Sequence, residues 1–308
     1  MAAITAKMVA DLRAKTGVGM MECKKALNES GGDFDEAIKI LREKGLSVAA
    51  KKAGRIAAEG VVDIMVEGNC AVMIEVNAET DFVAKNETFK EFVRGIEKAI
   101  LKGKPASIDE LLTLQYDDSF TVDAKLKDMI FTIGENMNIR RFVIVEGIFS
   151  TYIHGAGTTG VIVKFNTDDA IAAKPGFAEF AKNIALQIAA GSPPSYVTRD
   201  QVPASAVEEE KQVLIAQIKN DEKNANKPDA IIEKMVTGRI GKFYQRECLV
   251  EQDYVKDDSM TVGKYMEATA KELGGAISVD SFYLYEKGEG LEKKEDNFGD
   301  EIAEMLNK

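Results

Sequence analysis

The chain contains 308 residues, of which 45% are apolar and 30% charged, a composition typical of a globular protein with a sizeable core and more than one domain. No apolar run reaches the roughly 18 residues that a membrane-spanning helix needs, and the first residues lack a secretory signal pattern, so we expect a cytoplasmic protein. Its net charge of −11 argues against free nucleic acid as a partner. The cysteines, Cys23, Cys70 and Cys248, lack metal-binding spacing and are expected to be buried thiols.

Residues 4–45 have the apolar spacing of three short helices separated by glycines. Asp33 is expected to cap the third helix, because its carboxylate can accept from the free amides of the first turn, and the pattern ends this helix at Gly45. A helical N-terminal domain is therefore predicted at 1–46, followed by a helical or flexible linker at 47–59.

From residue 60 onward the apolar spacing changes to the alternation of β-strands. Two strand-like runs joined by a glycine turn precede an amphipathic helix, which predicts a hairpin packed on a helix. The expected elements are strands at Val61–Met65 and Ala71–Val76 and helices at Glu87–Leu101, Ile108–Leu114 and Asp123–Met137. Together they form a predicted core subdomain at 60–140.

A second unit of the same kind follows and is interrupted by an insertion. Its elements are expected at Phe142–Ile153, Val161–Phe165, Phe177–Ala190, Thr261–Leu273 and Ile277–Tyr285. This second core subdomain is predicted at 141–200 and 244–286. The insertion at 201–243 has narrow apolar stripes, which predict a coiled-coil hairpin. A C-terminal helical module is expected at 287–308, with a helix at Asn297–Leu306. The predicted fold class is α+β, with antiparallel sheet covered by helices on one face.

The two core units are related by an internal repeat. Residues 77–85, N-A-E-T-D-F-V-A-K, match residues 166–174, N-T-D-D-A-I-A-A-K, at an offset of 89. Where the first copy has Asp81-Phe82, the second has Ala170-Ile171, so the scaffold requires neither the charge nor the ring. One interpretation is that Phe82 packs under the next helix; the other is that a cap at Thr80 holds it outward. We favour the second and interpret Asp81-Phe82 as a contact site.

One motif resembles that of an enzyme. The sequence Gly155–Gly160 satisfies G-x-G-x-x-G, but a dinucleotide site needs a strand before the motif and a helix opening within it. Here a strand-like run follows, so we predict a hairpin loop. The single histidine, His154, excludes any site that needs two imidazoles. No catalytic residue, metal ligand or cofactor is predicted, and the chain is expected not to be an enzyme.

Several motifs resemble those of the bacterial elongation factor Ts family, the nucleotide exchange factors for elongation factor Tu. The stretch Lys15–Leu27 is similar to the N-terminal signature of the family, and Glu75–Asn77 with Thr80–Lys85 is similar to its second signature. The sequence G-E-N-M-N-I-R-R at Gly134–Arg141 and the pair His154-Gly155 also fit. The resemblance covers nearly the whole chain. It implies an N-terminal ubiquitin-associated-like domain, two related core subdomains, an inserted coiled coil and a C-terminal helical module.

The resemblance also implies a function in translation elongation. The chain would bind elongation factor Tu in its GDP-bound and nucleotide-free forms and promote GDP release, with a dimer of the heterodimer as one stoichiometry. The residues implied to enter the partner near its magnesium and phosphate site are Thr80, Asp81, Phe82, Val83, Ile133 and Gly134. Those implied to contact other parts of the partner are Leu12, Arg13, Met20, Met21 and His154.

Two alternative functions stay open on the residues alone. The first is a protein-binding scaffold or adapter without exchange activity, which the helical N-terminus and the hairpin suit. The second is a small-molecule enzyme, in which the glycine loop would have to bind NAD or a nucleotide. The pattern also leaves open whether Met20 and Met21 enter the small helical core or form an adaptable contact surface.

Overall fold

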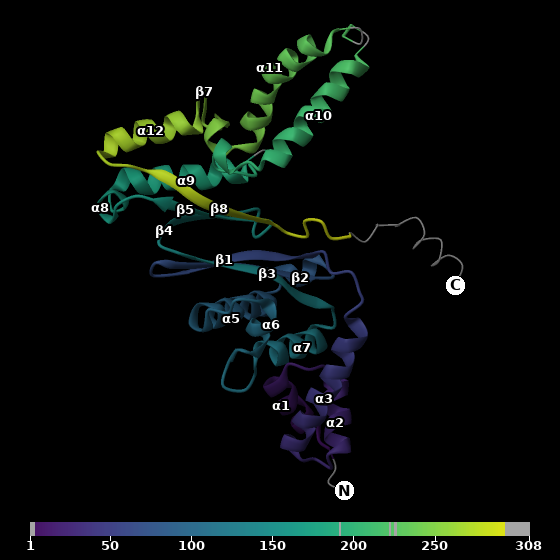
Figure 1. Cartoon of the computed structure of the whole chain (residues 1–308). Coiled ribbons are helices and arrows are strands. Elements are labelled where there is room, and N and C mark those ends of the chain that lie inside the picture. Colours follow the sequence, from purple (N-terminus) through teal and green to yellow (C-terminus); the bar gives the residue numbers. More distant parts are fainter. Residues whose placement is uncertain (1–3, 191, 222, 225–226, 293–308) are drawn as a thin grey trace.

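The computed structural model describes residues 4–190, 192–221, 223–224 and 227–292. Figure 1 shows a helical N-terminal part at one end, stacked sheets in the middle and a helical hairpin projecting from the other end. This mixture of helices and small antiparallel sheets confirms the α+β class. Within the part of the chain that the structure describes, no helix is long and apolar enough to cross a membrane.

Three helices form the N-terminal part: α1 (Ala6–Thr16), α2 (Met20–Glu29) and α3 (Phe34–Lys52). Asp33 accepts a hydrogen bond from the backbone amide of Glu36, which confirms the predicted cap. The prediction that the third helix ends at Gly45 is wrong. Gly45 faces Phe131 of α7, where an added Cβ atom would be in ordinary contact at 3.5 Å, and the helix continues through it to Lys52. The predicted domain boundary at 46/47 therefore falls inside α3.

The first sheet has the antiparallel order β1-β2-β3. Its strands are β1 (Glu59–Glu67), β2 (Cys70–Ala78) and β3 (Met137–Glu146). The helices beside it are α4 (Asp81–Lys85), α5 (Glu87–Gly103), α6 (Ile108–Thr113) and α7 (Val122–Ile133). The hairpin and its following helix are as predicted, and α5 packs its apolar side on one face of the sheet.

Two predicted boundaries near β3 are wrong. The helix expected at Asp123–Met137 ends at Ile133, because Gly134 adopts a left-handed backbone with φ 88° and caps it. Residues 141–146, expected in the second subdomain, pair with β2 in the first sheet. The apolar alternation runs on through Gly147, and only the positive φ of this glycine, 113°, marks the break.

The second sheet has the order β4-β5-β8 and is also antiparallel. Its strands are β4 (Ile148–His154), β5 (Thr159–Asn166) and β8 (Ser278–Glu286), and its helices are α8 (Asp169–Ala172), α9 (Pro175–Ala189) and α12 (Val262–Leu273). The return of the chain after the insertion to complete this sheet was predicted. The internal repeat is visible in the shared order of strand, short helix and long helix, β2-α4-α5 and β5-α8-α9.

Each sheet carries helices on its outer face and packs against the other sheet with its inner face (Figure 1). The inner cluster includes Val62, Ala71, Met73, Val145 and Ile162. Since β2 faces helices on one side and the second sheet on the other, every one of its residues is buried. The prediction of helices on one face of each unit is confirmed.

The insertion consists of α10 (Ala204–Asn220) and α11 (Asp229–Glu247), which pack through Leu214, Ile218, Ile232 and Val236. Helix α11 continues past the predicted end of the insertion at 243. The short helix η1 (Arg199–Gln201) precedes α10. The short helix η2 (Leu249–Glu251) and the strands β6 (Asp253–Tyr254) and β7 (Asp257–Thr261) follow α11. The helix predicted at Asn297–Leu306 lies outside the described residues.

Candidate protein-binding site

The side chain of Phe82 is 81% exposed, the most exposed large apolar side chain of the described residues. Thr80 is the N-cap of α4, and its hydroxyl accepts from the amide of Val83 at 3.4 Å. Val83 points into the core and is buried, so consecutive side chains diverge and Phe82 faces solvent. The prediction that a cap at Thr80 holds Phe82 outward is confirmed, and the alternative, packing under the next helix, is wrong.

Asp81 lies beside Phe82 and is ionised. Its carboxylate pairs with Lys85 one turn further along α4, with 2.6 Å between oxygen and nitrogen. This hydrogen bond is the main reason that the pKa of Asp81 lies below its usual value. The start of α4 therefore presents a negative charge and an aromatic ring side by side.

The second copy of the repeat shows what the scaffold needs at this place. Ile171 on α8 corresponds to Phe82, and it is buried, with 6% of its surface exposed. Its side chain is covered by Gly275, where an added Cβ atom would lie 2.6 Å from Ile171. The same position thus serves the core in one copy and faces solvent in the other.

The turn after α7 lies directly beside the start of α4, as the resemblance implies for Ile133 and Gly134. The carboxylate of Glu135 accepts from the amide of Thr80 at 3.0 Å and from its hydroxyl at 2.7 Å. In the opposite direction, the carboxylate of Glu79 accepts from the amide of Asn136 at 2.6 Å. Three hydrogen bonds therefore join the two segments.

The end of the N-terminal part is tied to the same turn. Lys52, in the last turn of α3, donates to the carbonyl oxygen of Gly134. The side chain of Asn136 donates to the carbonyl oxygen of Arg55 at 2.8 Å, and Arg55 pairs with Glu79 at 3.5 Å. Lys52 and Arg55, in the stretch predicted to be a helical or flexible linker, thus have defined partners.

Of the residues implied to form other contacts, some are exposed in the structure and one is buried. Met20 and Met21 are 52% and 65% exposed at the start of α2, which settles their placement as surface residues, and Arg13 is also exposed. Leu12 is fully buried among the N-terminal helices. The implied contact through Leu12 is therefore wrong, since its side chain belongs to the core.

His154 ends β4 and is exposed, far along the chain from α4. Its Nδ1 atom lies 3.1 Å from the hydroxyl of Tyr152. The loop Gly155–Gly160 joins β4 to β5 as a hairpin, which confirms that prediction. The carbonyl oxygen of Gly157 accepts from the amide of Val62 at 2.9 Å, so the loop packs on the first sheet. No helix opens within it, as a dinucleotide site would require.

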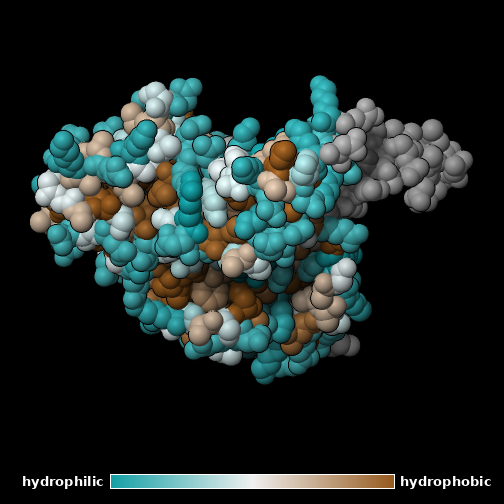
Figure 2. All heavy atoms as spheres, turned by 45° about the horizontal axis from the view of Figure 1, so that its top comes forward, coloured by the Kyte–Doolittle hydropathy of each residue, from teal (hydrophilic) through white to brown (hydrophobic). Residues whose placement is uncertain are grey.

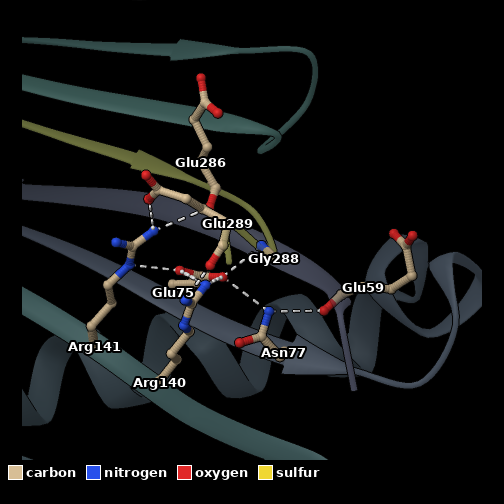
Figure 3. A network of polar contacts seen from close by, with 8 residues as sticks. All are labelled: Glu59, Glu75, Asn77, Arg140, Arg141, Glu286, Gly288 and Glu289. Atoms are coloured by element: carbon tan, nitrogen blue, oxygen red, sulfur yellow. Dashed lines mark hydrogen bonds and ion pairs between the residues drawn. The ribbon is translucent and has the colours of Figure 1, made fainter. Parts of the chain in front are cut away.

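A deeper network holds the two sheets together near this site. Figure 3 shows the carboxylate of Glu75, fully buried on β2, between Arg140 and Arg141 of β3. The amide of Gly288, in the turn after β8, donates to the same carboxylate at 2.8 Å. Burial alone would raise the pKa of Glu75, but these hydrogen bonds outweigh it and lower the pKa.

In residues 4–190, 192–221, 223–224 and 227–292, no group of three or more histidine, cysteine or acidic side chains could hold a metal ion. The three cysteines are free and buried, as predicted. On the face shown in Figure 2, hydrophilic residues dominate and the hydrophobic ones appear in separate patches.

The sequence analysis assigned no role to Glu79 or Glu135, although Glu135 lies in the quoted motif. Their hydrogen bonds join residues that are 57 and 55 positions apart in the chain.

The chain is similar to known proteins over nearly its full length. The family model described as "Elongation factor TS" matches residues 79–289. An elongation factor Ts of Clostridium kluyveri is 44% identical over 310 residues, covering 98% of this chain and 99% of the relative. Elongation factor Ts of Syntrophotalea carbinolica is 45% identical over 310 residues with the same coverage, and that of Clostridium botulinum is 44% identical over 311 residues, with 99% of each chain covered. The chain belongs to the elongation factor Ts family.

Proposed function

We propose that the chain is a translation elongation factor that binds elongation factor Tu and promotes the release of GDP from it. The observation that carries this proposal is the presentation of Phe82, 81% exposed on a segment fixed by hydrogen bonds. An isolated aromatic ring in water gains roughly 1.5–3 kcal/mol when a partner buries it. Family membership supports elongation factor Tu as that partner.

Exchange of this kind requires binding and no covalent chemistry. A protein that binds the nucleotide-free form of its partner better than the GDP-bound form weakens GDP by the same factor by which GDP weakens the complex. Phe82 and the charge of Asp81 would enter near the magnesium and phosphate site of the partner, with Ile133 and Gly134 beside them. A bound magnesium ion bridges phosphates and protein oxygens, so displacing its ligands loosens the nucleotide.

Further surfaces would hold the partner while Phe82 enters. We assign such contacts to Arg13, Met20 and Met21 at the N-terminal end and to His154 on the second sheet. The exposed thioethers suit this role because methionine adapts to irregular surfaces. Val83 supports the site from inside the core and is not itself a contact residue.

The arrangement of domains is also part of the proposal. The N-terminal helices would form a ubiquitin-associated-like domain that ends with α3 at Lys52. The core subdomains would follow the two sheets, which moves their boundary to Gly147. The hairpin α10-α11 would act as a coiled coil. The complex would form in the cytoplasm, without nucleic acid or a cofactor, as a heterodimer or a dimer of heterodimers.

The replacement Phe82→Ala tests the proposal through release of labelled GDP from elongation factor Tu. Losing about 1.5–3 kcal/mol of burial should slow stimulated release by about one to two decades. Val255→Ala is the matched control, because Val255 is also an exposed apolar residue, 51% exposed between β6 and β7. If folded Phe82→Ala protein stimulates release as fast as wild type, the role of Phe82 is refuted, and binding without any effect of the wild-type chain on release would favour the adapter.

A further inference from the structure

Two glutamates join the segment that carries Phe82 to the turn after α7 in a reciprocal way. Glu135 of the turn accepts from the amide of Thr80, and Glu79, next to Thr80, accepts from the amide of Asn136, next to Glu135. Each carboxylate therefore binds a backbone amide of the opposite segment. Side chains and backbone are both fixed, so neither segment can shift without breaking bonds to the other.

Glu135 has the more direct connection to Phe82. Its second oxygen accepts from the hydroxyl of Thr80 at 2.7 Å, and that hydroxyl in turn accepts from the amide of Val83. Both hydrogen bonds of Glu135 involve a charged acceptor and are stronger than neutral ones. The bonds hold the residue two positions before Phe82 and, through its cap, the residue after it.

An exposed ring depends on such support. Phe82 is 81% exposed and has little packing of its own, and α4 is a helix of only five residues. A helix this short is not stable by itself in water. The direction of the ring is therefore set by the contacts of Thr80 and Val83, and a ring held in its bound direction loses less conformational freedom on association.

We propose that Glu135 is a positioning residue that fixes the direction of Phe82 by binding the backbone and hydroxyl of Thr80. This proposal rests on the proposed function, because it assigns to Glu135 an effect on GDP release that passes through Phe82. Glu135 itself needs no contact with the partner. Its effect must then depend on the presence of the ring.

A double-mutant cycle on stimulated GDP release tests the dependence. The proteins are wild type, Glu135→Ala, Phe82→Ala and the double variant, each assayed with GDP-loaded elongation factor Tu. We expect Glu135→Ala to slow release by about threefold or more in the wild-type background and by less than about 1.5-fold in the Phe82→Ala background. Glu135→Gln retains one acceptor oxygen and should fall between wild type and Glu135→Ala.

A matched control separates positioning from a general loss of stability. Glu110, at the start of α6, also binds a backbone amide, that of Ala106 at 2.8 Å, but it lies on a different helix from Phe82. Glu110→Ala should leave release unchanged. Urea unfolding of each variant shows whether it is folded, and if Glu135→Ala does not fold, Glu135→Gln takes its place in the cycle.

The outcomes distinguish the two proposals. If Phe82→Ala slows release but a Glu135 variant slows both backgrounds by the same factor, or neither, the positioning role is overturned and the role of Phe82 stands. If the wild-type chain does not stimulate release, the proposed function fails; if it does but Phe82→Ala leaves the rate unchanged, the role of Phe82 fails, and the positioning role fails with it in both cases. Slowing by the Glu135 variant only where the ring is present supports both.

Discussion

Replacing Glu75 with glutamine should break the polar network between the two sheets and strongly lower the free energy of unfolding. The carboxylate of Glu75 is fully buried and accepts from Arg140 at 3.0 Å, Arg141 at 2.7 Å, Asn77 at 3.0 Å and the amide of Gly288 at 2.8 Å. Arg141 also binds the carbonyl oxygen of Glu286 and the carboxylate of Glu289 (Figure 3). Glu75→Gln keeps the shape, removes the charge and turns an amide NH2 group, which is itself a donor, toward some of these donors.

The expected loss follows from what remains unpaired. Breaking a buried ion pair from one side costs about 3–5 kcal/mol, because the partner charge stays behind. Here the side chains of Arg140 and Arg141 are 22% and 27% exposed, so water solvates part of the remaining charge. We therefore expect the lower end, a loss of about 3 kcal/mol in the free energy of unfolding.

Urea unfolding followed by circular dichroism measures this loss, and its pH dependence has a defined sign. Because the pKa of Glu75 is lowered in the folded chain, its ionised form contributes stability above its usual pKa of 4.5, and this contribution is lost as the pH falls. The difference between wild type and Glu75→Gln should be largest near neutral pH and shrink in acid.

The matched control is Glu146→Gln, which removes an ion pair with Lys104 in which both side chains are more than half exposed. Exposed pairs contribute little, so the loss should be much smaller than for Glu75. A loss of less than about 1 kcal/mol for Glu75→Gln near neutral pH, or one that grows in acid, would refute the account of the network.

Two further replacements test other parts of the scaffold by urea unfolding. Burial, and then the nearby carboxylate of Asp63, raise the pKa of Glu97 from 4.5 to about 9, so the folded chain binds a proton that the unfolded chain releases. The free energy of unfolding then falls by about 1.4 kcal/mol per pH unit between these two pKa values. Glu97→Gln should therefore stabilise the chain at about pH 8, and this gain should disappear near pH 5. A loss of stability at about pH 8 would contradict this explanation. Gly60→Ala should destabilise by about 2 kcal/mol or more, since Gly60 has φ 128° and an added Cβ would lie 2.1 Å from the carbonyl oxygen of Val76, whereas Gly54→Ala, in open space, should not.

Local signals in the sequence were sufficient to predict most helices and strands. The cap at Asp33 begins the helix that it predicts, the helix expected at Thr261–Leu273 is present with Thr261 as its N-cap, and the strand expected at Ile277–Tyr285 completes the second sheet. One error has a local cause, the cap at Gly134, and the others occur where the deciding contact is remote in sequence. Gly45 is typical of a helix end, but α3 continues through it and packs against α7, and the division between β3 and β4 depends on which sheet each strand joins.

The site divides in the same way. The exposure of Phe82 could be predicted because the chain carries its own reference, a second copy with Ala170-Ile171 at the same place. Leu12 follows Ile4 and Met8 at helical apolar spacing, so the sequence already favoured the core for it, and only the resemblance implied that it is a contact residue like its exposed neighbour Arg13. Glu135 could not be assigned a role because its partner Thr80 lies 55 residues away.

The comparison of the two copies also shows why Phe82→Ala can test a partner contact without changing the stability of the fold. Ile171 is 6% exposed, so shortening it would open a cavity and destabilise the fold. Phe82, at the corresponding place, is 81% exposed, so most of its ring contributes nothing to the core. Phe82→Ala should therefore leave the free energy of unfolding nearly unchanged. A slower release of GDP by that variant would then report a lost contact with the partner, because the fold provides no other route for the effect.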